Sequence, residues 1–187
     1  KALAGLIVIG SYIELTTLQL NKVLEISLCK PIEINVLKLY TFFKLEDNLN
    51  QINSFKKLIL NTIRQNLRQD FVPVLFTSRE IVSPRDNNDL IEFQHFLSVF
   101  IAELVSAIKN EIGYLISKGG ITTNTIISKG FGADSVYLEG QILPGISLVT
   151  FNLLKQKGKL PIVTFPGNIG DHMSLVKSLE IIENKNF

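Results

Sequence analysis

Short unbroken runs of apolar residues alternate along the chain with longer stretches in which apolar residues recur every three or four positions. A run such as Leu6 to Ile9 stops at Gly10, which is typical of a strand buried on both faces. The longer stretches carry their apolar residues on one side, as amphipathic helices do. This order of elements predicts an α/β protein, a three-layer sandwich with a mostly parallel or mixed central sheet.

Turn-forming residues between the runs set the expected boundaries of the elements. Pro31 is expected to end the first helix, and the stretch from Glu33 to Phe43 alternates and is rich in β-branched and aromatic residues, which favours a strand. We expect strands at residues 6–9, 33–43, 72–77, 114–118, 135–139, 146–154 and 161–165. We expect helices at residues 14–28, 48–69, 89–112 and 171–183, a short helix that ends near residue 129, and polar connections at 140–145 and 156–159.

Composition limits the classes of function. The 187 residues suit one domain, 1–187, and 46% hydrophobic with 19% charged residues is far from a disordered chain. A net charge of +2 with scattered Lys and Arg gives no nucleic-acid surface. The one cysteine, Cys29, cannot form an internal disulfide and has no Cys or His partner at metal-ligand spacing, so we expect a buried apolar role and no metal site. No apolar run is long enough to predict a membrane span, and we expect a cytoplasmic protein.

The stretch from Tyr114 to Thr125 has the chemistry of an anion site. An apolar run stops at Gly119-Gly120 and gives way to a polar helix start, which Thr122, Thr123 or Asn124 is expected to cap. Glycines let a backbone approach a phosphate, and the N–H groups of a first helical turn carry partial positive charge.

The same pattern occurs at two other places in the chain. Gly10-Ser11 follows the first apolar run, and the segment from Pro166 to Asp171, Pro-Gly-Asn-Ile-Gly-Asp, follows the last. Open α/β sheets bind ligands at the carboxyl ends of their strands. Three such junctions therefore predict one shared site for a phosphorylated small molecule.

Several familiar motifs are absent or incomplete. Gly130-Phe-Gly132 has Ser135 where a dinucleotide-binding fingerprint needs its third glycine, and Lys118 precedes its glycines, which is the wrong order for a Walker loop. The nucleophile elbow and the His-Glu-x-x-His helix are missing from the sequence. Two alternatives remain open from the residues alone: Gly119-Gly120 can be a plain tight turn, and Asp171 can either cap a helix or hold Mg²⁺ through water.

Taken together, these motifs resemble a known family. They are Gly10-Ser11 with Thr16 and Gln19, Lys118-Gly-Gly-Ile-Thr-Thr, the stretch from Gly130 to Gly145, and Phe165-Pro-Gly-Asn-Ile-Gly-Asp171. Their order and spacing are similar, over nearly the whole chain, to the C-terminal nucleotide-binding domain of the four-carbon acid sugar kinases, formerly a domain of unknown function. The resemblance implies ATP-dependent phosphorylation, with Mg²⁺, of a threonate, erythronate or oxo-tetronate type of sugar acid.

The resemblance also implies where ATP would bind and what else the enzyme contains. The family's nucleotide-binding positions fall on Ser11, Gly119, Gly120, Ile121, Thr122, Thr123, Gly167, Asn168 and Gly170. The sugar-acid site and the catalytic base are expected in a separate N-terminal domain, so this chain would be the C-terminal part of a longer protein. The oligomeric state stays open, a homo-oligomer included.

One departure from the family pattern leaves a second function open. Relatives often carry an acidic residue after the Gly-Gly-x-Thr segment, and this chain has Asn124 and Thr125 there. The metal ligand is therefore unassigned. The alternative is a non-catalytic nucleotide-binding or regulatory module of the same fold.

Overall fold

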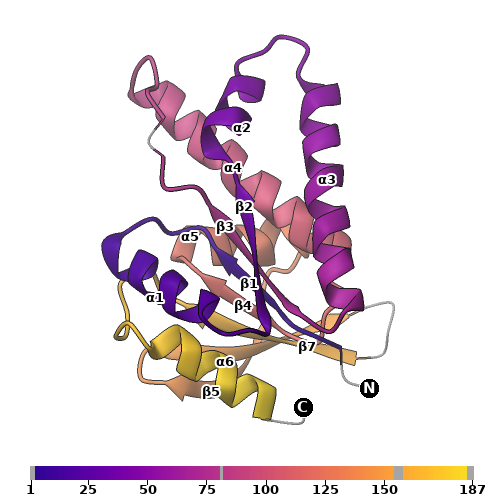
Figure 1. Ribbon diagram of the computed structural model, residues 1–187, viewed down its shortest axis with the longest axis vertical. Coiled ribbons are helices and arrows are strands. Elements are labelled where there is room, and N and C mark those ends of the chain that lie inside the picture. The colour runs from indigo at the N-terminus through magenta and orange to yellow at the C-terminus, as the bar shows by residue number, and fades with distance from the viewer. Residues whose placement is uncertain (1–2, 81, 154–157, 185–187) are drawn as a thin grey trace.

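The computed structural model describes residues 3–80, 82–153 and 158–184, and in these ranges the chain forms one seven-stranded sheet in the order β2-β3-β1-β4-β7-β6-β5 (Figure 1). The first five strands of this order are parallel, and β6 and β5 are added as an antiparallel hairpin at one edge. The strands are β1 (Leu6–Ile9), β2 (Cys29–Ile34), β3 (Val72–Thr77), β4 (Leu115–Lys118), β5 (Tyr137–Leu143), β6 (Ile146–Leu153) and β7 (Gly158–Phe165). The helices are α1 (Glu14–Leu24), α2 (Val36–Phe43), α3 (Leu49–Arg68), α4 (Asn87–Ile108), α5 (Gly120–Thr125) with its π-helical continuation η1 (Ile126–Gly130), and α6 (Ser174–Asn184).

Helices cover the two faces of the sheet in separate groups. α1 and α6 pack together on one face, and α3, α4 and α5 with η1 lie on the other (Figure 1). Each face has its own buried apolar cluster, the first including Val23 and Leu179 and the second including Phe93 and Phe100. The structure thus confirms the expected three-layer α/β sandwich with a mixed sheet.

Strand register brings the carboxyl ends of the parallel strands to one edge. Ile9, the last residue of β1, lies opposite Lys118 of β4 and Phe76 of β3, and Lys118 in turn lies opposite Phe165 at the end of β7. The loops that follow these strands therefore start side by side.

The prediction of a strand at 33–43 is wrong. β2 begins earlier, at Cys29, and the following residues form α2, whose start is capped by the Asn35 side chain accepting a hydrogen bond from the N–H of Lys38 at 2.7 Å. Pro31 lies inside β2, which is tolerated because β2 is at the edge of the sheet. Val36 and Leu39 are the buried residues of α2, so apolar residues at helical spacing were misread as the alternating apolar residues of a strand.

Other boundaries shift by a few residues. The first helix ends at Leu24 instead of residue 28, and residues 140–143, expected in a connection, belong to β5. The helices expected at 48–69 and 89–112 and the strands expected at 6–9 and 72–77 are confirmed. The polar connection expected at 156–159 lies partly outside the described residues, and its last two residues start β7.

Among the described residues, α4 is the helix that is long and apolar enough to cross a membrane by length and composition. Core helices of globular proteins pass the same test. Its residues Phe93, Phe100, Leu104 and Ile108 are buried against the rest of the protein.

Candidate functional site

Three loops meet at the carboxyl edge of the sheet. They are Gly10-Ser11 after β1, Gly119-Gly120 after β4, and Pro166-Gly167 after β7. Backbone hydrogen bonds join their bases: the N–H of Gly10 donates to the carbonyl of Lys118 at 3.1 Å, and the N–H of Gly119 donates to the carbonyl of Phe165 at 2.8 Å. The structure therefore brings together the three junctions that the sequence singled out.

Ser11 is the contact point between the first loop and the last. A β-carbon on Gly167 would lie 2.9 Å from Oγ of Ser11, and Oγ1 of the buried Thr16 lies 3.1 Å from both the Ser11 hydroxyl and the Gly167 carbonyl. Thr16 sits in the first turn of α1, so the start of this helix is tied to a loop that follows it by about 150 residues in the chain. The glycine permits a close approach of its backbone to the Ser11 side chain that a β-carbon would obstruct.

Gly119 and Gly120 give the middle loop its shape and its open side. Gly119 has φ of +120°, a conformation that residues with a β-carbon rarely adopt. A β-carbon on Gly120 would meet no atom within 4 Å, so its Cα faces open space. A hollow of about 260 Å³ begins there, between the first turns of α5 and the end of β7, and is lined by Gly120, Thr123, Asn124, Ile127, Thr164, Phe165 and Pro166.

The helix after this loop starts without a side-chain cap. α5 begins at Gly120, directly after the cap position Gly119, so the prediction that Thr122, Thr123 or Asn124 caps it is wrong. The Thr123 hydroxyl instead donates to the carbonyl of Ser117 at 3.1 Å, and its N–H donates to the carbonyl of Gly119 at 2.9 Å. The donors of Thr123 are thus engaged inside the protein, where they stabilise the turn.

The neighbours of Thr123 point in different directions. Thr122 is buried, with its Oγ1 against Gly10, where a β-carbon would come within 2.0 Å of it. Ile121 is 76% exposed and lies on the outer surface of α5. The N–H groups in the first turn of a helix have no intrahelical acceptor, so the backbone from Gly120 to Thr122 is the part of α5 suited to an anion.

The last loop continues from Gly167 into α6. Asn168 is exposed beside Gly167, whereas Gly170 packs against Ser174, whose Oγ would lie 2.5 Å from a β-carbon there. The buried Gln19 side chain donates from Nε2 to the carbonyls of Ile169 at 3.2 Å and Asp171 at 2.7 Å. Gly170 and Gln19 thus shape the loop, and Pro166 and Gly167 are the residues that reach the other two loops.

Asp171 serves the start of α6. Its Oδ1 accepts hydrogen bonds from the N–H of Met173 at 2.9 Å and from Oγ of Ser174 at 2.8 Å, and its Oδ2 lies 3.2 Å from Nζ of Lys177. Hydrogen bonds from Ser174 and Lys177 lower the pKa of the Asp171 carboxyl to about 2. Of the two roles that the sequence left open, these contacts at the start of α6 fit the capping role.

Lys118 is a buried cation that the sequence analysis did not assign to the site. It is fully buried, donates from Nζ to the carbonyls of Pro166 at 3.1 Å and Gly167 at 3.2 Å, and lies 3.8 Å from the centre of the Phe165 ring. Burial lowers the pKa of its ammonium group to about 8. The side chain joins the end of β4 to the loop after β7. In the sequence, the position of Lys118 at the end of a buried strand was the signal that could have assigned it to the site.

Arg79, two residues beyond the end of β3, reaches the same edge. Its Nη1 donates to the carbonyl of Ser11 at 2.7 Å. Burial lowers the pKa of the guanidinium, with a smaller opposite effect from Glu33. Ser78, Arg79 and Glu80 directly follow β3, and the sequence analysis did not predict the contact of Arg79 with Ser11.

The described residues offer no group of three or more His, Cys, Asp or Glu side chains that could hold a metal ion. Within the three loops Asp171 is the one carboxylate in the sequence, and it is occupied by Met173, Ser174 and Lys177. These residues therefore do not fit a protein-held Mg²⁺ site.

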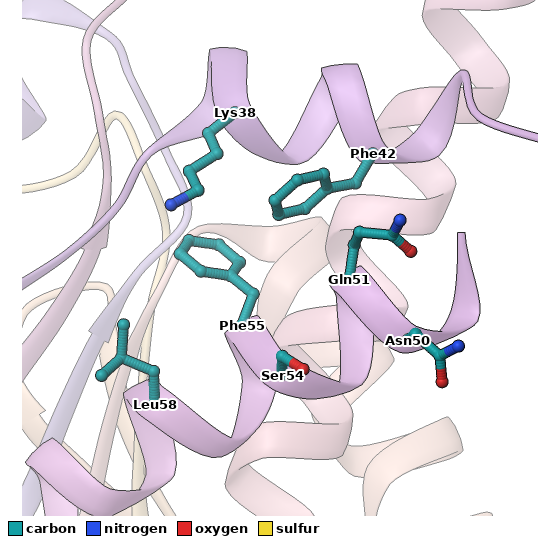
Figure 2. Close-up of a pocket in the computed structure, with 7 residues that line it drawn as sticks. All are labelled: Lys38, Phe42, Asn50, Gln51, Ser54, Phe55 and Leu58. Carbon is teal, nitrogen blue, oxygen red and sulfur yellow. The ribbon is translucent and has the colours of Figure 1, made fainter. Parts of the chain in front are cut away.

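A second hollow, of about 440 Å³, lies between α2 and α3 and is lined by none of the candidate residues (Figure 2). Figure 2 shows the ammonium group of Lys38 reaching toward Phe55, and its Nζ lies 5.5 Å from the centre of that ring. The lining residues are Lys38, Phe42, Asn50, Gln51, Ser54, Phe55 and Leu58. Because no loop from a strand end lines this hollow, we place the candidate site at Ser11, Gly120 and Gly167 instead.

Comparison with known proteins finds a matching family. A family model described as a nucleotide-binding C-terminal domain matches residues 6–175, which include all three loops. No curated protein matches the chain significantly.

Solved structures share the fold. A domain of unknown function (DUF1537) from Bordetella bronchiseptica, crystallised with bound citrate as a domain-swapped dimer, has a TM-score of 0.77 and 15% identity over 100% of this chain and 42% of that chain. A Haemophilus influenzae protein of the DUF1537 family has a TM-score of 0.67 and 17% identity over 96% of this chain and 40% of that chain. The chain thus spans about two fifths of the length of these proteins, and at such identities the likeness shows the fold alone.

Proposed function

The chain belongs to the family of nucleotide-binding C-terminal domains, and on that basis we propose that it is the ATP-binding part of a kinase that phosphorylates a four-carbon sugar acid. The observation that carries this proposal is the meeting of Ser11, Gly120 and Gly167 at the carboxyl edge of the sheet. The open side of Gly120 leaves room for a phosphate, and the first turn of α5, whose N–H groups have no intrahelical acceptor, begins at this residue.

Each loop has its own part in binding. The hydroxyl of Ser11 would donate a hydrogen bond to a phosphate oxygen, and the backbone from Gly120 to Thr122 would surround the phosphates, with Gly119 and Thr123 shaping the turn. Lys118 and Arg79 place two positive charges behind these loops without an ion-pair partner among the described residues. The hollow beside Gly120 would take the adjoining part of the nucleotide.

Phosphoryl transfer depends mainly on positioning and on stabilising the negative charge of the phosphates. In the proposed reaction the bond from the terminal phosphorus to the ADP oxygen breaks, and a bond to a hydroxyl oxygen of the sugar acid forms. The proton of that hydroxyl passes to a base that we place in a separate N-terminal domain, together with most of the sugar-acid site. Mg²⁺ would accompany the nucleotide through its phosphate oxygens.

The solved structures that share the fold bear on the oligomeric state. The two compared above are DUF1537 proteins, and the one from Bordetella bronchiseptica is a domain-swapped dimer, so a homo-oligomer is compatible with the proposal. We further propose that residues 1–187 are the C-terminal part of a longer two-domain protein that acts in the cytoplasm.

A non-catalytic nucleotide-binding or regulatory module is the competing function. It is favoured by the absence of any free carboxylate in the three loops, where Asp171 is already engaged. Both functions require nucleotide binding, and only the first requires turnover.

Calorimetric titration of this chain with a non-hydrolysable ATP analogue, with and without Mg²⁺, tests the shared part of the two functions. Saturable binding with one site per chain is the expected result. Phosphorylation of a four-carbon sugar acid by the longer protein then separates kinase from module. If neither this chain nor the longer protein binds the analogue, both functions are excluded.

A further inference from the structure

The guanidinium of Arg79 uses only one of its nitrogens in the described structure. Nη1 donates to the carbonyl of Ser11, whereas Nε and Nη2 are inaccessible to solvent and have no hydrogen-bond acceptor among the described residues. A buried donor left without an acceptor is destabilising, more so when it is charged.

Arg64 shows how the same two nitrogens of an arginine bind an anion in this protein. Arg64 on α3 binds the Glu111 carboxylate through Nε, at 3.1 and 3.0 Å from its two oxygens, and through Nη2 at 2.8 Å. These N–H groups form one side of the guanidinium fork, whose geometry matches two oxygens of a carboxylate or a phosphate. Arg79 holds the equivalent fork in place through Nη1 and leaves it without a partner.

The position of this fork indicates which kind of ligand it binds. Arg79 is anchored to the backbone of Ser11, and the Ser11 side chain contacts Gly167 in the loop that lies beside Gly119. Glu33 opposes the lowering of the Arg79 pKa, but it makes no ion pair with Arg79 in the described part of the chain. The ligand chemistry required is an anion with two adjacent oxygens, next to the loops assigned to phosphate.

We propose that the Nε and Nη2 fork of Arg79 binds a phosphate group of the nucleotide and thereby selects nucleotides over nucleosides. This inference rests on the proposed function. A carboxylate of the acceptor acid has the same chemistry, but the anchoring of Arg79 to Ser11 favours the phosphate.

Titrations with adenosine, AMP, ADP and a non-hydrolysable ATP analogue test the inference. In Arg79→Met we expect the affinity for the phosphate-bearing ligands to fall by about tenfold or more, with adenosine binding unchanged. Arg79→Lys should recover only part of the loss, because an ammonium group cannot bind two oxygens as a fork. The melting temperature of Arg79→Met should stay the same or rise, because an unpaired buried charge is removed.

Arg68→Met is the matched control. Arg68 is an exposed residue at the end of α3, just before β3 begins, so it lies at the opposite edge of the sheet. Its substitution removes the same charge and should leave all four affinities unchanged.

Four results would overturn the inference. Equal losses for adenosine and for the ATP analogue would mean that Arg79 only supports Ser11. Unchanged nucleotide binding would exclude the phosphate contact, and a loss of sugar-acid affinity alone, measured with the longer protein, would reassign the fork to the acceptor carboxylate. If the wild-type chain and the longer protein bind none of the four ligands, the proposed function fails, and the inference fails with it.

Discussion

Oγ of Ser11 lies 2.9 Å from the position that a β-carbon on Gly167 would occupy. Ser11 follows the first strand of the chain and Gly167 follows the last strand, so this contact joins the two ends of the described fold at its carboxyl edge. The predictions below concern this contact and the groups around it.

Gly167→Ala should press the two loops apart and lower the free energy of unfolding by about 1 to 3 kcal/mol, since the added carbon has no room. Without the Ser11 hydroxyl, the atom nearest to the carbon added at residue 167 would be Cβ of residue 11 at 3.4 Å, which is an ordinary contact. Gly167→Ala should therefore destabilise the Ser11→Ala variant less than it destabilises the wild type. Urea unfolding of the two single variants and the double variant measures the coupling, expected at about 1 kcal/mol. Additive effects would contradict the contact.

Ser11→Ala should weaken binding of the ATP analogue by about 1 kcal/mol, roughly fivefold, if the hydroxyl donates one hydrogen bond to the nucleotide. Calorimetric titration measures the change. Ser54→Ala, an exposed serine on α3, serves as the control and should bind as the wild type does. Equal affinities for Ser11→Ala and wild type would remove the hydroxyl from the site.

Gly120→Val should abolish nucleotide binding and leave the fold intact. The new side chain would enter the open space beside Gly120, where no protein atom lies within 4 Å, and would fill the volume assigned to a phosphate. Titration reports the binding, and circular dichroism with thermal melting reports the fold. Gly120→Ala should give an intermediate loss, and a folded Gly120→Val variant with unchanged affinity would exclude this loop.

Lys118 should make the stability of the protein depend on pH in the alkaline range. Its pKa is about 8 in the folded state, against 10.5 for a lysine exposed to solvent, so between these values the unfolded chain binds more protons. Stability therefore rises with pH across this window, and the cost of burying the charge is fully present below it. Relative to Lys118→Met, wild type should gain up to about 3 kcal/mol from pH 8 to pH 10.5.

Urea unfolding of both proteins across the window measures that difference. Lys57→Met, which removes an exposed lysine of α3, is the control and should show a constant offset from wild type. A constant offset for Lys118→Met as well would show that Lys118 titrates like an exposed lysine.

Much of the fold and the family could be predicted from the sequence. Runs such as Leu6–Ile9 and Val72–Thr77 are buried strands as expected, because a parallel strand covered on both faces needs apolar residues throughout. The resemblance to a C-terminal nucleotide-binding domain is confirmed by the family model, and structures of DUF1537 proteins share the fold. The failure at 33–43 had a local cause, since a short apolar segment fits a strand or a helix until Asn35 is recognised as a cap.

The sequence by itself determined which residues end the buried strands, and so which glycines and hydroxyls could form a site. Only the tertiary structure decided how those residues are used. Thr123 turned inward to Ser117, Asp171 was taken by Ser174, and Lys118 and Arg79 came to lie behind the loops through contacts with Gly167 and Ser11. The contacts of Lys118 with Gly167 and of Arg79 with Ser11 join segments far apart in the chain, and they depend on strand order and register, which local spacing does not encode.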